Sequence, residues 1–218
     1  MTSILSEHQK RLLALLGSER IVANSFYFTG GTVLAEYYLH HRLSEDLDFF
    51  CEDEVPSDAV LAVLKSIQAR AGIESIRFEQ SFNRNLFFLE VGGETIKTEF
   101  TYFPFPRIDK TKKQGGLAVD SLTDIAVNKV FTIFQKPRSR DFVDLFCIMR
   151  EKKWTMADLV AKAQIKFDTY MDPIQLGAQL LRAEALRDYP RMLIPLEPRE
   201  RQAFFKEEAK KLGPQVLD

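Results

Sequence analysis

The sequence predicts an α+β fold, in which a mixed sheet flanked by helices is followed by a helical C-terminal lobe. Three observations support this prediction. Residues 26–50 read as a strand, a glycine turn, a helix and a second strand. Residues 77–102 contain three strand patterns separated by turns rich in Asn and Gly. Beyond residue 106, apolar residues recur at helical intervals, and several of these segments begin with Asp or Thr as capping residues.

The remaining elements follow in order along the chain. An amphipathic helix is expected at residues 6–16, and Ser57 caps a helix that runs to about residue 71. The strands of the second group are expected at residues 77–82, 86–91 and 94–102. The segment Phe103-Pro104-Phe105-Pro106 breaks regular structure, so it is the expected boundary between lobes of residues 1–106 and 107–218. After a loop at residues 110–116, helices are expected at residues 122–135, 141–151, 155–167, 173–187 and 198–212.

The composition is that of a folded, water-soluble protein. Of the 218 residues, 45% are hydrophobic, and 18 are Phe, which is ample for a core and excludes extensive disorder. No apolar run approaches the roughly 20 residues that span a bilayer, so a membrane protein is excluded. Cys51 and Cys147 lie far apart in the sequence, which favours reduced thiols and a cytoplasmic location.

The net charge of −1 conceals an uneven distribution. Residues 1–106 carry 9 Lys and Arg against 15 Asp and Glu, whereas residues 107–218 carry 21 against 16. An acidic half that holds a cation and a basic half that holds phosphates would suit an enzyme acting on nucleic acid. A chance difference between two solvated surfaces explains the asymmetry equally well.

A glycine turn precedes a pair of acids in residues 26–50. Gly30 and Gly31 follow the first strand, and a helical pattern then begins at Leu34 and reaches His41. Backbone N–H groups at such a turn can face a phosphate, although an ordinary tight turn is an equal alternative. The side chains of Asp46 and Asp48 share one face of the next strand, since side chains alternate along a strand. Adjacent carboxylates repel each other unless a divalent cation lies between them, so the pattern indicates metal-assisted nucleotidyl transfer.

Two blocks of the sequence resemble a known family. The first, GGTVLAEYYLHHRLSEDLDFF, is similar to the signature of the AbiEii/AbiGii-type nucleotidyltransferases, which belong to the polymerase-β-like superfamily. Its matching positions are Gly30-Gly31-Thr32, His41-Arg42, Ser44, Asp46 and Asp48. The second block, residues 124–146, resembles the lysine-bearing helix and the Arg-Asp-x-x-Asp element of the family, with matches at Lys129, Arg140, Asp141 and Asp144. Two ordered blocks are far more specific than either motif alone, and they imply a polymerase-β-like minimal nucleotidyltransferase fold.

The resemblance implies a third carboxylate on a strand beside the two aspartates, and Glu99 is the candidate. The polar residues Thr95, Lys97, Glu99 and Thr101 alternate along this strand, as they would if they lined a cleft. The alternative is a solvated sheet face that Glu99 and Lys97 merely decorate. We therefore expect Asp46, Asp48 and Glu99 to be the catalytic ligands of Mg²⁺ or Mn²⁺.

The expected nucleotide ligands are the turn and loop residues of the first block and the charged residues of the second. They are Gly30, Gly31, Thr32, Arg42, Ser44, Lys129, Arg140 and Asp141. Lys129 is also expected to be catalytic, because an ammonium from the helical lobe would neutralise charge on the phosphates. An exposed helix lysine is the alternative for Lys129, and a role at the start of a helix is the alternative for Asp141.

The predicted function is Mg²⁺-dependent transfer of a nucleoside monophosphate from an NTP to an acceptor hydroxyl. The acceptor is open: tRNA, another RNA, a protein side chain or a small molecule. By resemblance, the protein is expected to be the toxin of a toxin–antitoxin or phage-defence pair, with a cognate antitoxin as partner. A catalytically degenerate member that binds nucleotide or protein is the alternative. A plain RNA-binding domain is disfavoured, since the sequence contains none of the usual aromatic–basic RNA-binding motifs.

Overall fold

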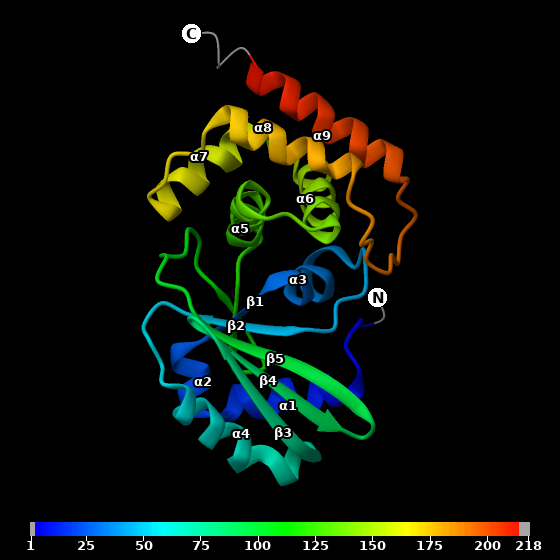
Figure 1. The fold of residues 1–218 in the computed structure, drawn as a ribbon. Helices are drawn as coiled ribbons and strands as arrows, with labels where there is room; N and C mark the ends of the chain where they lie inside the picture. The colour runs from blue at the N-terminus through cyan, green and yellow to red at the C-terminus, as the bar shows by residue number, and fades with distance from the viewer. Residues whose placement is uncertain (1–2, 214–218) are drawn as a thin grey trace. The chain divides into compact units, whose positions relative to one another are not determined.

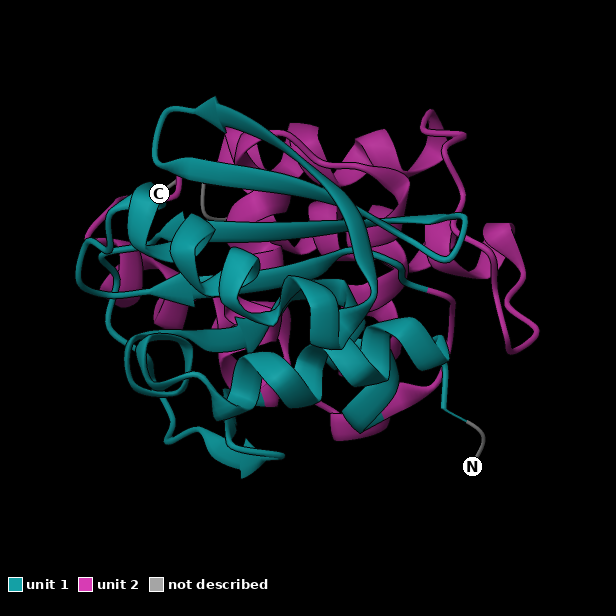
Figure 2. Cartoon of the chain, turned by 90° about the horizontal axis from the view of Figure 1, so that it is seen from below, with its two compact units in different colours: residues 1–38, 44–121 teal, residues 39–43, 122–218 magenta. Residues whose placement is uncertain are grey.

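The computed structural model describes residues 3–213, and these residues form two compact units (Figure 2). The first unit is built from the described residues of 1–38 and 44–121, and the second from those of 39–43 and 122–218. The chain therefore enters the second unit briefly at residues 39–43, returns to the first, and enters the second again at residue 122.

The first unit contains a seven-stranded mixed sheet. Its strands are β1 (Tyr27–Thr29), β2 (Leu47–Cys51), β3 (Ile73–Ser81), β4 (Arg84–Val91), β5 (Glu94–Tyr102), β6 (Lys112–Gln114) and β7 (Leu117–Val119). They lie in the order β3-β4-β5-β2-β1-β7-β6. The pairs β2–β5 and β1–β7 are parallel, and the other neighbouring pairs are antiparallel.

Three helices cover one face of this sheet, namely α1 (Glu7–Ser18), α2 (Arg20–Ser25) and α4 (Ser57–Ala71) (Figure 1). A capping box starts α1, because the Ser6 side chain accepts the Gln9 N–H and the Gln9 side chain accepts the Ser6 N–H. The buried rings of Phe28, Phe49 and Phe100 share the covered face and stack at 5.1 and 4.9 Å between centroids. This aromatic layer fixes the register of the central strands, since a slip by one residue would turn the rings to the opposite face.

A short α-helix, α3 (Gly30–Val33), and a π-helical segment, η1 (Leu34–Leu39), follow β1 on the opposite face of the sheet (Figure 1). The helix ends at Leu39, earlier than the apolar pattern predicts. His40 has a φ of 48°, in the left-handed region that ends a helix. His41 and Arg42 therefore lie beyond the helix, in the segment that joins the second unit.

The second unit is helical, as the sequence predicts. Its helices are α5 (Leu122–Gln135), α6 (Ser139–Lys152), α7 (Met156–Phe167), α8 (Pro173–Leu181), the 3₁₀ turn η2 (Arg182–Glu184) and α9 (Pro198–Leu212). Thr155 caps α7, and Asp172 caps α8 just before Pro173. Residues 39–43 pair with the loop after η2, where Leu193 donates its N–H to the His41 carbonyl at 2.9 Å. The mixed sheet and the helical C-terminal portion confirm the predicted fold class.

The structure divides the chain at a different point from the predicted boundary at residue 106. Residues 107–121 stay with the first unit, because β6 and β7 form a hairpin and β7 pairs with β1. The segment 110–116 was expected to be a loop, and it contains β6 instead. Strand β7 completes the sheet on the far side of β1, so a cut at residue 106 would remove two strands from the first unit.

Two further expectations concern the thiols and the membrane. Cys51 and Cys147 are both free thiols, and burial raises the pKa of each to about 11. In residues 3–213, no helix combines the length and the apolar character that a bilayer span requires.

Candidate functional site

Three acids lie on the face of the sheet opposite the aromatic layer. Asp48 on β2 and Glu99 on β5 are direct partners in the parallel register. Asp46 immediately precedes β2, two residues before Asp48, so its position has the same parity. The strand register therefore sets Asp48 beside Glu99, and all three residues that the sequence predicts as metal ligands share this face of the sheet.

Two cations neutralise part of this acidic group. Lys97 lies two residues before Glu99 on β5, and its Nζ is 3.0 Å from Oδ2 of Asp46. Arg84, at the start of β4, donates from Nε to Oε1 of Glu99 at 2.7 Å and from Nη2 to Oε2 at 2.5 Å. Arg84 lies between the strands expected at residues 77–82 and 86–91, but β4 begins at Arg84, which lies opposite Thr101.

Glu99 is held as a carboxylate in a buried position. Its side chain is 6% exposed, and it also accepts a hydrogen bond from the Thr101 hydroxyl at 2.7 Å. Burial raises the pKa of the Glu99 carboxyl, but the hydrogen bonds from Arg84 and Thr101 and the charges of Arg84 and Lys97 hold it below its usual value. Glu99 is therefore an anion at neutral pH.

The glycine turn packs directly against the acids. Gly30 has a φ of 80°, and a Cβ at this position would collide with the carboxylate of Asp48. Thr32 is fully buried and donates from its hydroxyl to the backbone carbonyl of Asp46 at 2.5 Å, and this hydroxyl lies 2.9 Å from that of Ser44. Thr32 and Ser44 therefore position the loop that carries Asp46, and their predicted contact with nucleotide stays a prediction.

We expect Gly30→Ala to destabilise the protein by more than Gly93→Ala. Both glycines have φ near 80°, but an added Cβ meets the Asp48 carboxylate at Gly30 and nothing within 4 Å at Gly93. The backbone conformation alone should cost about 1 kcal/mol in each variant, and the collision adds to this at Gly30. Urea unfolding of the two variants measures the difference, and equal midpoints would contradict the close approach of Gly30 to Asp48.

The donor set suits a hard divalent cation in kind. Carboxylate oxygens are the ligands that Mg²⁺ and Mn²⁺ prefer. Their positions do not yet form a metal site, because no group of three His, Cys, Asp or Glu side chains in the described part of the chain is arranged to hold a metal ion. Lys97 and Arg84 occupy oxygens of Asp46 and Glu99, so these two cations would have to move for all three acids to bind one ion.

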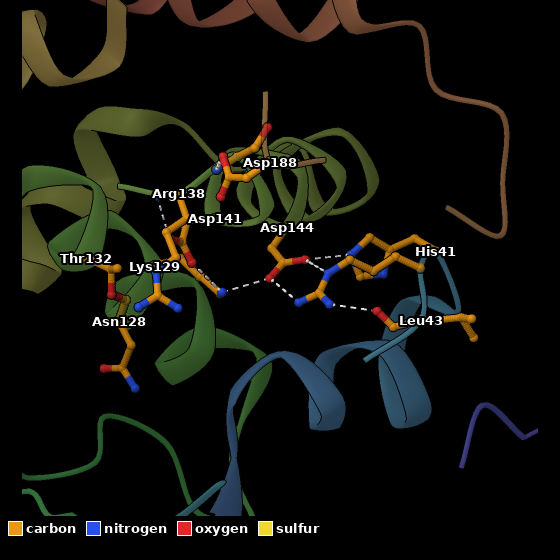
Figure 3. Close-up of polar contacts among 11 residues, drawn as sticks. His41, Leu43, Asn128, Lys129, Thr132, Arg138, Asp141, Asp144 and Asp188 are labelled. Atoms are coloured by element: carbon orange, nitrogen blue, oxygen red, sulfur yellow. Dashed lines mark hydrogen bonds and ion pairs between the residues drawn. The ribbon is translucent and has the colours of Figure 1, made fainter. Parts of the chain in front are cut away.

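The second unit contains a buried charged network centred on Asp144 of α6 (Figure 3). Asp144 is fully buried and accepts two bonds from Arg42, at 2.6 Å from Nε and 2.9 Å from Nη2. Nε2 of His41 lies 2.8 Å from Oδ1 of Asp144, and Nζ of Lys129 lies 2.8 Å from Oδ2. Burial raises the pKa of Asp144, but the charges of Lys129 and Arg42 outweigh it and hold the pKa well below its usual range.

Lys129 and Asp141 form a second ion pair within this network. Nζ of Lys129 lies 2.7 Å from Oδ1 of Asp141, and the lysine side chain is only 12% exposed. Burial lowers the pKa of Lys129, but Asp144 and Asp141 together raise it above its usual value. Asp141 also accepts the backbone N–H of Arg138 at 3.0 Å, so it serves the start of α6 as well.

The sequence predicts Arg42, Lys129, Arg140 and Asp141 as nucleotide ligands. The structure places the first two in ion pairs to Asp144, whereas the neighbouring Arg140 on α6 is partly exposed. Lys129 was expected to neutralise charge on the phosphates, with an exposed helix lysine as the alternative, and in the structure its ammonium is held by both Asp141 and Asp144. The predicted contacts of these residues with nucleotide stay predictions.

Comparison with known proteins identifies the family. The profile described as "Nucleotidyl transferase AbiEii toxin, Type IV TA system" matches residues 11–212. The chain belongs to the AbiEii family. The uncharacterized protein aq_aa25 of Aquifex aeolicus (strain VF5) is 30% identical over 148 residues, which are 67% of this chain and 68% of that protein. The AbiEii match extends over both compact units.

Two solved structures share the fold of this AbiEii protein. JHP933 from Helicobacter pylori superposes with a TM-score of 0.59 at 20% identity, covering 97% of this chain and 94% of the other. A second H. pylori protein, assigned as a nucleotidyltransferase, superposes with a TM-score of 0.61 at 21% identity, covering 97% of both chains. At these identities the likeness establishes the fold, while the AbiEii profile establishes the reaction class. The protein is a nucleotidyltransferase.

Proposed function

We propose that this AbiEii protein transfers a nucleoside monophosphate from an NTP to an acceptor hydroxyl, with Mg²⁺ or Mn²⁺ bound at the acidic face of the first unit. The observation that carries the proposal is the register of β2 and β5, which sets Asp48 beside Glu99 on the face that also bears Asp46. Carboxylates from two neighbouring strands are a suitable donor set for metal-assisted phosphoryl chemistry.

Each residue of the acidic face has a role in this proposal. Asp46 and Asp48 would hold the divalent cation, with Glu99 as the third acid. When bound, the cation would polarise the α-phosphate and lower the pKa of the attacking hydroxyl. The Gly30–Gly31 turn would present backbone N–H groups to the β- and γ-phosphates beside Asp48. Thr32 would keep the Asp46 loop in place through its hydrogen bond to the Asp46 carbonyl.

The biological role that we propose follows the description of the family as a type IV toxin. The protein would be the toxin of a toxin–antitoxin or phage-defence pair, regulated by a cognate antitoxin protein. An RNA acceptor, tRNA in particular, offers the required terminal hydroxyl. We further propose a cytoplasmic location, in keeping with the two free thiols.

The test is a transfer assay. Purified protein is incubated with each labelled NTP in turn, with total RNA as acceptor and Mg²⁺ or Mn²⁺ in the buffer. We expect label to enter one RNA size class from a preferred NTP, and EDTA to abolish the transfer. The alternative function is a degenerate member that binds nucleotide or protein without turnover, and the ion pair between Arg84 and Glu99 favours it. Binding of NTP with no transfer to RNA, protein or small acceptors would establish that alternative.

A further inference from the structure

Arg84 is a residue outside both sequence blocks, and it contacts the acidic face directly. It lies on β4 opposite Thr101 and reaches diagonally to Glu99 of β5. Its Nε and Nη2 bind the two carboxylate oxygens of Glu99 at 2.7 and 2.5 Å. This two-pronged arrangement is the geometry in which a guanidinium binds either a carboxylate or a phosphate.

The two partners of this ion pair differ in their exposure to solvent. The Glu99 side chain is 6% exposed and is also bonded to the Thr101 hydroxyl. The Arg84 side chain is 46% exposed. If the pair separates, the long arginine side chain can move into water while the carboxylate stays in place. The anion is therefore the fixed partner and the cation is the movable one.

Two more acids share the face of the sheet that bears the Arg84–Glu99 pair. Asp48 is the direct register partner of Glu99, and Asp46 lies two residues before Asp48. A divalent cation bound to the same carboxylates would compete with the guanidinium for their negative charge. Metal binding and the Arg84–Glu99 pair are thus mutually opposed.

We propose that Arg84 is a counter-ion switch that neutralises Glu99 until a divalent cation binds and then transfers to a phosphate of the metal-bound polyphosphate. This inference rests on the proposed function, since it requires metal at Asp46, Asp48 and Glu99. A polyphosphate chain carries several negative charges, so it gives the released guanidinium a new bidentate partner. Arg84 becomes a ligand of the triphosphate as well as a competitor of the metal.

The experiment compares Mn²⁺ binding with polyphosphate binding in wild type and Arg84→Met. For Mn²⁺ alone, measured by electron paramagnetic resonance of the free ion, the variant should bind about tenfold more tightly, the effect of one charge-assisted hydrogen bond. For inorganic tripolyphosphate with Mn²⁺ in excess, measured by calorimetry, it should bind about tenfold more weakly. Opposite signs from one substitution distinguish the switch from structural damage, which would weaken both.

Two variants serve as controls. Arg77→Met removes an arginine of β3 that is 60% exposed and paired with Glu79, and it should change neither affinity. Arg84→Lys keeps the positive charge but loses the planar guanidinium that binds through two N–H groups, so its effects on Mn²⁺ and tripolyphosphate affinity should be intermediate. Circular dichroism verifies folding, and Arg84→Gln replaces Arg84→Met if the latter does not fold.

The outcomes separate the switch from the proposed function. If Arg84→Met changes the affinities for Mn²⁺ and for tripolyphosphate in the same direction, or changes neither, the switch is overturned. Binding of Mn²⁺ by wild type would in that case still support the proposed metal site. Absence of Mn²⁺ binding by wild type, or equal binding by Asp46→Asn/Asp48→Asn, would overturn both.

Discussion

Replacing Asp144 with alanine should lower the free energy of unfolding by about 3–5 kcal/mol, the typical cost of removing one partner from a buried ion pair. Asp144 is fully buried and binds both Arg42 and Lys129. Without the carboxylate, Arg42 loses both of its bonds to Asp144 and Lys129 keeps only Asp141. Urea unfolding followed by circular dichroism measures the loss.

A matched control is available in the same unit. Glu200 pairs with Arg150 at 2.9 Å, but both side chains are more than half exposed, at 53% and 57%. Glu200→Ala should therefore change the free energy of unfolding by about 1 kcal/mol at most. If Asp144→Ala yields too little folded protein to measure, Lys129→Met is the substitute, with a smaller loss because the Arg42–Asp144 pair remains. If the variant that is measured loses no more free energy of unfolding than Glu200→Ala, the network does not stabilise the unit.

The Asp144 network also shows where sequence reasoning stops. Helices such as α4, α5 and α9 were predictable because apolar periodicity is a local signal. The predicted cap of α4 was wrong, since Ser57 is the first residue of the helix, and its N-cap Pro56 makes no side-chain capping bond. The apolar pattern just before Arg42 predicts a helix that reaches His41, and it gives no sign that Arg42 is buried. Arg42 instead pairs with Asp144, 102 positions later, and this distant partner buries it. A buried arginine cannot be distinguished from a phosphate ligand when its partner lies so far along the chain.

The short hairpin of β6 and β7 was missed for a related reason. Each strand has three residues, and Lys112 and Lys113 beside a Gly-Gly turn resemble an exposed loop. What makes β7 a strand is its parallel pairing with β1, about 90 positions earlier in the chain. Propensity at three residues cannot reveal a pairing partner at that separation.

The acidic face was more accessible to prediction than its cations. Asp46 and Asp48 were predicted from strand alternation, and Glu99 from the polar face of its strand together with the resemblance to the family. The parallel register of β2 and β5 then sets Asp48 beside Glu99. Arg84 depends in addition on the register of the β4–β5 hairpin, which sets it opposite Thr101 and within reach of Glu99. The sequence shows a hairpin there, but its exact pairing decides which side chain meets the acid.

The double substitution Asp46→Asn/Asp48→Asn should reduce nucleotidyl transfer by about a thousandfold or more. A bound divalent cation supplies several kcal/mol of transition-state stabilisation, and each step of about 1.4 kcal/mol changes the rate tenfold. Asparagine keeps the size of aspartate but removes the negative charge that, in the proposed function, would hold the cation. Initial rates of label transfer from NTP to RNA, at saturating Mg²⁺, measure the effect.

The control removes two negative charges from a nearby exposed turn. Asp53 and Glu54 lie one residue beyond the end of β2 and are both exposed, so Asp53→Asn/Glu54→Gln makes the same change in net charge at an exposed site. Its transfer rate should stay within about twofold of wild type, because exposed charges at this separation are screened by salt. Unfolding midpoints should match wild type in the control and stay close to it in the double aspartate variant, so a rate loss cannot be attributed to unfolding. Full transfer activity in Asp46→Asn/Asp48→Asn would remove these aspartates from the active site and leave the acidic face without a role in catalysis.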